Sequence, residues 1–184
     1  MDVIAISGHA RAGKDTLAKE LKKELEKKGK RVLITHYADF LKYICSTYYG
    51  WDGQKDEKGR QLLQTVGQSF RDNHYNCWVN MMSNFLSGVG KSIDIVIIAD
   101  CRYKNELDID FRGMENIYSI RIIRPDFDNG LTPEQQAHPS ETDLDNYEFD
   151  LYVKNDSTEE RFLSKVPIII QDFNLKTGKL INII

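Results

Sequence analysis

The sequence has few cysteines and no long apolar run, and both shortages exclude classes of protein. Cys45, Cys77 and Cys101 are too few and too scattered for a disulfide framework or a zinc site, so we expect reduced, buried thiols in a cytosolic (cytoplasmic) protein. No apolar segment approaches the roughly 18 residues that a membrane-spanning helix needs, and none has the form of a signal peptide, which predicts no membrane association.

The chain also lacks an excess of positive charge. It contains 25 Lys and Arg against 28 Asp and Glu, a net charge of −3, which argues against a nucleic-acid partner but not against a local basic pocket. With 184 residues, 41% of them hydrophobic, we expect one globular domain that folds without metal or disulfide.

Segments typical of strands and helices alternate, which predicts an α/β fold with a mostly parallel, five-stranded sheet. Leu17, Leu21 and Leu25 recur at helical spacing and Gly29 ends that helix. The strands are expected at about 2–7, 32–34, 95–99, 120–123 and 149–153.

Two segments interrupt the alternation and divide the single domain. Residues 37–90 form a long, mostly helical insertion, and residues 125–147 form a polar loop. The core is then 1–36, 91–124 and 148–184. A capping box at 157–160 opens a last helix, which we expect Pro167 to kink or end.

The strongest motif, GHARAGKDT at positions 8–16, lies between the first strand and the first helix. Glycines let the backbone curl so that its N–H groups point at a phosphate, and the start of the helix adds a positive dipole. Lys14 can reach the β- and γ-phosphates of a nucleotide. The motif therefore predicts a phosphate-binding P-loop; the alternative is a turn that happens to precede a helix.

The residue after this lysine is Asp15, where P-loops usually carry Ser or Thr to meet Mg²⁺. Either Asp15 or Thr16 can take the metal. Asp100 ends the apolar strand 95–99, so we expect it at the carboxyl edge of the sheet beside the P-loop, with Arg102 projecting to the same side. The alternative is a surface pair of Asp100 with Arg102.

The insertion contains a polar stripe. Arg60, Gln64, Gly67 and Arg71 fall within about 60° of arc on one helical face, which suits a second anionic group. The alternative is a solvated helix face. Trp78 belongs either to a surface that stacks on a base or to the core.

The polar loop 125–147 and the residue before it contain Arg124, His138, Ser140 and Glu141. A kinase must exclude water from the transferring phosphoryl group, and a closing segment with positive charge does this. We therefore interpret 125–147 as a lid; the alternative is an ordinary exposed loop.

In these motifs and their order, the chain resembles the phage-type deoxynucleoside monophosphate kinases. Animal-type phosphomevalonate kinases share similar sequence segments. The matching segments follow the family's order to about Arg161, whereas the tail after Phe173 matches nothing. They are GHARAGKDT (8–16), YADFLK (37–42), GRQLLQTVGQSFR (59–71), IIADCRYKNE (97–106), HPSE (138–141) and YVKND (152–156).

The resemblance implies a three-layer P-loop NTPase fold and transfer of the γ-phosphoryl group from ATP, with Mg²⁺, to a small-molecule (deoxy)nucleoside monophosphate. For ATP it implies Gly8, Arg11, Ala12, Gly13, Lys14, Asp15, Thr16 and Asn155. For the acceptor it implies Lys42, Arg60, Gln64, Arg71 and Trp78. For catalysis it implies Lys14, Asp100 and Arg102, and for the metal Asp15, Thr16 or Asp100.

Two other functions stay open at this point: a P-loop kinase of another small phosphorylated metabolite, and a non-catalytic ATP-binding regulatory module. A motor ATPase fits less well, because the chain is acidic and has no separate polynucleotide-binding region. The base, the sugar and the existence of a homodimer are also open.

Overall fold

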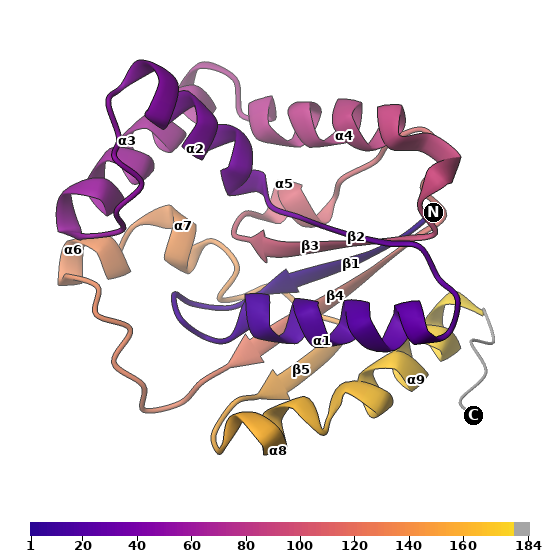
Figure 1. The fold of residues 1–184 in the computed structure, drawn as a ribbon. Coiled ribbons are helices and arrows are strands. Elements are labelled where there is room, and N and C mark those ends of the chain that lie inside the picture. Colours follow the sequence, from indigo (N-terminus) through magenta and orange to yellow (C-terminus); the bar gives the residue numbers. More distant parts are fainter. Residues whose placement is uncertain (179–184) are drawn as a thin grey trace.

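The computed structural model describes residues 1–178 and contains one sheet of five strands (Figure 1). The strand order is β2-β3-β1-β4-β5 and every pair is parallel. The strands are β1 (Asp2–Ser7), β2 (Val32–Thr35), β3 (Ile95–Cys101), β4 (Asn116–Ile123) and β5 (Leu151–Lys154). The sheet confirms the predicted α/β class.

Helices cover both faces of this sheet, which makes three layers (Figure 1). On one side lie α1 (Lys14–Lys27), α8 (Glu159–Leu163) and α9 (Val166–Thr177). On the other lie α2 (Tyr37–Tyr48), α3 (Glu57–Asn73), α4 (Cys77–Val89) and α5 (Lys104–Leu107). Short helices α6 (Pro133–Gln136) and α7 (Pro139–Thr142) lie beyond the carboxyl ends of the strands, and a 3-10 turn, η1 (Gly90–Ser92), leads into β3.

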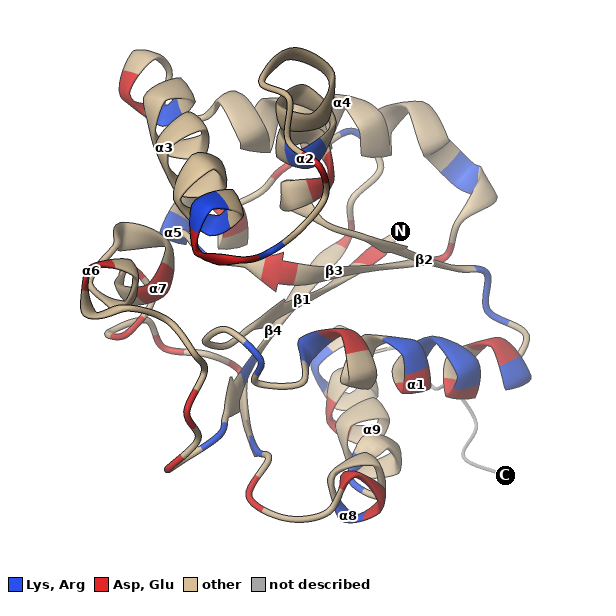
Figure 2. Ribbon diagram, turned by 60° about the vertical axis from the view of Figure 1, so that its left-hand side comes forward, with Lys and Arg blue, Asp and Glu red and all other residues tan. Residues whose placement is uncertain are grey.

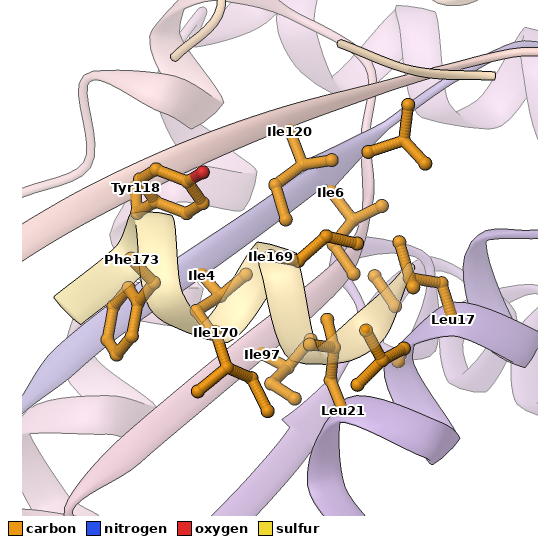
Figure 3. Close-up of a cluster of buried hydrophobic side chains, with 14 of the residues drawn as sticks. Ile4, Ile6, Leu17, Leu21, Ile97, Tyr118, Ile120, Ile169, Ile170 and Phe173 are labelled. Carbon is orange, nitrogen blue, oxygen red and sulfur yellow. The ribbon is translucent and has the colours of Figure 1, made fainter. Parts of the chain in front are cut away.

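Alternate residues of the central strand β1 supply two separate cores. Ile4 and Ile6 face the layer of α1 and α9 and join a buried cluster with residues such as Leu21 (Figure 3). Val3 and Ala5 face the other layer and join the cluster of α2 and α4. Because both faces are covered, the strands need apolar residues at nearly every position, as parallel sheets do.

The first helix follows directly from its sequence. Leu17, Leu21 and Leu25 have no exposed surface, and their spacing puts them on the one face that packs on the sheet. Figure 2 shows Lys and Arg alternating with Asp and Glu along the outer surface of α1. Gly29, with φ of 75°, reverses the chain after the helix as predicted.

A register shift changes the end of β3. Ala5 pairs with Ile98, but Ser7 pairs with Cys101, so β3 carries one additional residue next to the P-loop. The alternation of β3 changes with it, because Ile98 and Cys101 belong to the same core cluster. Bulges of this kind turn a side chain in a new direction. Here the side chain that changes direction is that of Asp100, and the sequence pattern did not predict the register shift.

The expectation for Pro167 is wrong. The helix opened by Thr158 ends at Leu163, four residues earlier, and Pro167 lies in the first turn of α9. Proline is favoured there because its missing N–H has no partner in the first turn of a helix. Helix α9 continues to Thr177 and ends at Gly178; the rest of the unmatched tail lies outside the described residues.

The remaining expectations concern segments between the strands. Three helices, α2 to α4, fill the predicted insertion, and two one-turn helices, α6 and α7, lie within the predicted lid. Within residues 1–178, none of the helices has the length and apolar character needed to span a membrane.

Candidate active site

The P-loop joins β1 to α1 and depends on two glycines. Gly8 and Gly13 have φ of 153° and 104°, which other residues rarely adopt. A Cβ on Gly8 would lie 2.9 Å from the carbonyl oxygen of Ile122, and a Cβ on Gly13 would lie 2.9 Å from Nδ2 of Asn155. Both the curl of the loop and its close packing therefore require glycine.

Lys14 begins α1 and folds back over the loop. Its Nζ donates hydrogen bonds to the carbonyl oxygens of Gly8 (2.7 Å) and His9 (2.8 Å). Burial, together with the nearby positive charge of Arg102, lowers the pKa of Lys14 to about 7. This lysine is thus held where the backbone of the loop curls, as the motif predicts.

Asp15 follows and is held by a residue that the sequence did not single out. His36, directly after β2, has its Nε2 2.9 Å from Asp15 Oδ1 and its Nδ1 3.2 Å from Asp39 Oδ2. The hydrogen bond to Asp15 raises the pKa of His36, and the same bond lowers the pKa of Asp15. His36 therefore joins the P-loop to the start of α2.

Asp100 lies at the carboxyl edge of the sheet, as predicted, and its carboxylate binds the start of α2. Its two carboxylate oxygens accept hydrogen bonds from the backbone N–H groups of Tyr37 (2.8 Å) and Ala38 (2.9 Å). These are the first residues of α2, where unpaired N–H groups and the helix dipole favour a carboxylate. Asp100 thereby fixes the inserted helix to the sheet, and it is not paired with Arg102.

Arg102 contacts the segment interpreted as a lid, residues 125–147, instead. Its Nη1 donates to Glu141 Oε1 at 2.7 Å, and Glu141 Oε2 accepts from the backbone N–H of Ala10 at 3.1 Å. Burial alone would raise the pKa of Glu141, but hydrogen bonding to His9 and the charge of Arg102 bring it down to about 2. One lid carboxylate therefore connects the P-loop to the residue after β3.

Helix α3 brings its polar stripe to the same region. Arg71 is 8% exposed, and its Nη2 donates to Glu106 Oε1 at 2.5 Å. Its buried Nη1 has no hydrogen-bond partner among residues 1–178. Gln64 Nε2 donates to the carbonyl oxygen of Gln135 in α6 at 3.4 Å. Arg60 Nε donates to the carbonyl oxygen of Lys55 at 2.9 Å.

Two other predicted acceptor residues lie beside this stripe. Lys42 Nζ donates to Asp39 Oδ1 at 2.9 Å. Trp78 is 2% exposed, donates from Nε1 to the carbonyl oxygen of Gly67 at 3.2 Å, and packs its ring 5.2 Å from that of Phe70. The structure thus places Trp78 in the core beneath α3, where it also contributes to the cavity wall.

Two cavities meet at the P-loop. The larger, about 740 Å³, is enclosed by the P-loop, α2, α3, the end of β3 and the lid; the smaller, about 330 Å³, lies between the P-loop and the segment after β5. Arg11, Lys14 and Asp15 line both. In Figure 2, basic residues of α2, α3 and the start of α1 surround the carboxyl end of β3.

Together the cavities contain all the predicted site residues except Gly8, which lines neither. The larger contains Arg11, Lys14, Asp15, Lys42, Arg60, Gln64, Arg71, Trp78, Asp100, Arg102, His138, Ser140 and Glu141. The smaller contains Arg11, Ala12, Gly13, Lys14, Asp15, Thr16, Arg124 and Asn155. The four lid residues are therefore separated, since Arg124 alone faces the smaller cavity while the others face the larger.

Two residues shape the smaller cavity. Asn155 Nδ2 donates to the carbonyl oxygen of Ala12 at 2.9 Å, and Arg124 Nη1 donates to that of Arg11 at 2.9 Å. The guanidinium of Arg124 also lies 3.5 Å from the ring centre of Phe127. Both side chains therefore hold the P-loop backbone at residues 11 and 12, from the side opposite the insertion.

Sequence reasoning missed several residues of the site. They are His36, Lys55, Glu106 and Arg121, of which the first three line the larger cavity and Arg121 lies beneath the P-loop. Arg121 is 9% exposed and bonds Ser7 and Asp145. Glu106 is the last residue of the segment IIADCRYKNE (97–106), which carries part of the family resemblance. Its place in that segment, four residues after Arg102, was the sequence feature that could have identified it as a site residue.

The chemistry of the donor set fits a magnesium ion only in part. Among residues 1–178 no three His, Cys, Asp or Glu side chains gather as a metal cluster. Mg²⁺ bound to nucleotide phosphates needs only one or two carboxylates, however, because phosphates and water complete its shell. Asp15 lines both cavities and satisfies this requirement, while Thr16 faces the smaller cavity and both oxygens of Asp100 already accept amide hydrogen bonds.

A P-loop between the central strand and the first helix of a five-stranded parallel sheet is the arrangement of the P-loop NTPase fold. No family model matches the sequence, and neither does any curated protein. Solved structures with the same fold do match along almost the whole chain.

Three of these are kinases of small molecules. A sugar kinase from Janibacter sp. HTCC2649 is 10% identical, with a TM-score of 0.55, and the match covers 93% of this chain and 95% of that one. Dephospho-CoA kinase from Campylobacter jejuni is 12% identical, with a TM-score of 0.53 and coverage of 92% and 96%. Shikimate kinase from Aquifex aeolicus is 13% identical, with a TM-score of 0.52 and coverage of 95% and 99%. At such identities the likeness establishes the fold.

Proposed function

We propose that this protein transfers the γ-phosphoryl group of ATP to the phosphate of a (deoxy)nucleoside monophosphate and so makes the diphosphate. The observation that carries the proposal is Arg71, whose buried Nη1 has no partner and whose side chain lines the cavity that also contains Lys14. A buried guanidinium N–H without a partner is costly, so it points to an acceptor group supplied by a ligand.

The two cavities support a reaction between two ligands. ATP fits with its phosphates in the P-loop and its base toward Asn155 in the smaller cavity, and the acceptor fits in the larger one. Lys14 and Arg102 then lie where they can stabilise negative charge as it passes from the nucleotide to the acceptor. Magnesium held by Asp15 would neutralise charge on the β- and γ-phosphates.

The walls of the larger cavity favour a nucleotide as acceptor over a purely aliphatic phosphate. Leu41, Leu63 and Gly67 supply an apolar surface, while the amides of Gln64 and Gln68 lie one helical turn apart at its edge. A flat base with hydrogen-bonding groups on its rim suits such a pocket, since polar groups placed on apolar walls set orientation.

The lid supplies the exclusion of water. Gln64 and Gln135 join α3 to α6, and Glu141 joins α7 to the P-loop and to Arg102, so the larger cavity is closed on this side. Closure of this kind keeps water from competing with the acceptor oxygen for the phosphoryl group.

Incubation with ATP and Mg²⁺ and each nucleoside or deoxynucleoside monophosphate in turn, scored by ADP release, tests the proposal. We expect turnover with at least one of them. Turnover with phosphomevalonate alone would move the acceptor to another class of metabolite. Binding of ATP without ADP release from any acceptor would make the protein a nucleotide-binding module.

A further inference from the structure

Glu106 in α5 is a buried carboxylate that connects two functional arginines. It is 1% exposed. Its Oε1 accepts from Arg71 Nη2 at 2.5 Å, and its Oε2 accepts from the backbone N–H groups of Arg102 (2.6 Å) and Tyr103 (3.2 Å). Burial raises the pKa of Glu106 to about 7, while the charge of Arg71 and the two backbone hydrogen bonds oppose that rise, because a buried carboxylate is costly unless it is paired.

This carboxylate fixes the direction of Arg71. The guanidinium bonds Glu106 at one nitrogen and lies 3.7 Å from the ring centre of Tyr103. A long, flexible side chain held at two points loses most of its freedom before any ligand binds. The partnerless Nη1 is therefore held in one orientation at the cavity wall.

The same carboxylate fixes the backbone of Arg102. The bond to its N–H is short, and it forms where the chain leaves β3, just after the register shift. The side chain of Arg102 continues from this point to Glu141, which in turn accepts from the P-loop N–H of Ala10. The carbonyl oxygen of Glu106 also accepts from the hydroxyl of Tyr37 at 3.0 Å, so α2 is attached to the same residue.

We infer that Glu106 is a positioning residue that sets Arg71 and Arg102 relative to each other, so that acceptor binding and phosphoryl transfer depend on one buried carboxylate. The inference rests on the proposed function, in which Arg71 binds the acceptor and Arg102 stabilises the transferring group. Small displacements of such groups have large kinetic effects, because transfer requires the two phosphates to be in line.

Glu106→Gln tests the inference, since glutamine keeps the size of the side chain but presents an N–H₂ group to one of the donors. We expect both a lower kcat and a higher KM for the acceptor, each by roughly 10- to 100-fold. The dissociation constant of a non-hydrolysable ATP analogue, measured by calorimetry, should change by less than about twofold, because Glu106 does not line the smaller cavity. Adding Arg71→Gln to this variant should raise the acceptor KM little further.

The matched control is Asp150→Asn. Asp150 also accepts from a backbone N–H, that of Ser119, and pairs with Lys176, but it precedes β5 at the opposite edge of the sheet. Its kinetics should stay at the wild-type level. Should Glu106→Gln fail to fold, Glu106→Asp, which keeps the charge but withdraws it by one methylene, should show the same effects at smaller size.

The outcomes separate the two claims. A wild-type protein without turnover overturns the proposed function. A wild-type protein with turnover, together with a folded Glu106→Gln variant whose kcat and acceptor KM match those of Asp150→Asn, overturns the positioning role. An equal loss of affinity for the ATP analogue and for the acceptor also overturns it, because a general loosening of the fold would act on both.

Discussion

At the scale of single residues, Lys14 is predicted to matter for the proposed phosphoryl transfer and not for folding. It is buried, and within residues 1–178 its Nζ donates to two carbonyl oxygens of the loop. We expect Lys14→Ala to lower kcat by about 10²–10³-fold, since one preorganised donor to a developing charge is typically worth that much. Thermal unfolding should occur within a few degrees of wild type, and a loss of folding instead would give Lys14 a structural role.

Arg71 is predicted to affect binding of the acceptor but not binding of ATP. Removing its guanidinium takes away the free Nη1 and leaves Glu106 buried without its partner, so Arg71→Ala should lose both acceptor affinity and some stability. Initial-rate kinetics should show the acceptor KM rising by roughly 10- to 100-fold while the KM for ATP changes little. An increase confined to the ATP constant would contradict the role of the polar stripe on α3.

Glu141 makes the stability of the protein depend on pH. Its pKa falls from an ordinary 4.5 to about 2 on folding, so its contribution is complete above 4.5 and is lost as the pH falls from there toward 2. We expect Glu141→Gln to cost up to roughly 3 kcal/mol at pH 7. In urea unfolding, the difference from wild type should shrink between pH 5 and pH 3.

Glu148→Gln is the control for this measurement, because Glu148 is an exposed carboxylate that directly follows the segment 125–147. It should change stability by less than about 0.5 kcal/mol at every pH. A Glu141→Gln effect that stays constant from pH 7 to pH 3 would mean that its carboxylate charge does not hold the lid.

For single residues, the sequence predicts which side chains lie near the site better than it predicts what those side chains contact. The motif placed Lys14 at the start of the first helix, where the structure has it, because the motif and the strand before it are local in the chain. The partners of Asp100 and Arg102 could not be predicted, since a register shift in β3 sends Asp100 to the amides of α2 and the lid supplies Glu141 from far along the chain.

At the scale of elements, the start of α3 depends on one glycine. A Cβ on Gly59 would lie 2.0 Å from the carbonyl oxygen of Gln54, so the loop before α3 must shift to admit any side chain. That loop carries Lys55, which lines the larger cavity. Gly59→Ala should cost about 1–3 kcal/mol in urea unfolding and raise the acceptor KM.

Gly88→Ala is the matched helical control. In the part of the chain that the structure describes, nothing lies within 4 Å of a Cβ at Gly88, near the end of α4. Alanine there should stabilise the protein by about 0.5–1 kcal/mol through helix propensity. Equal effects of the two substitutions would show that the loop before α3 adapts freely.

The helices and strands themselves were predictable wherever a periodic apolar pattern was long, as in α1. The prediction failed at Pro167, because whether a proline ends a helix or begins one depends on where the helix starts.

At the scale of the whole molecule, the sheet was predictable because five apolar segments alternate with helices and parallel strands must be covered on both faces. The division of the site into two cavities was not, because it depends on how the insertion and the lid fold back over the ends of the strands. A sequence pattern does not show how closely the insertion and the lid approach the ends of the strands. The arrangement of the two cavities leads to a prediction about how their ligands bind.

Because the cavities share the P-loop but extend to opposite sides of it, both ligands should bind at once. At concentrations about 100-fold above its dissociation constant, each should stabilise the fold by about 2.7 kcal/mol, which raises Tm by roughly 5–10 °C. A non-hydrolysable ATP analogue and a monophosphate acceptor together should give a shift close to the sum, and Arg71→Ala should lose the acceptor's share alone. If the acceptor adds nothing once the analogue is present, the two compete for the P-loop, and the larger cavity is not an acceptor site.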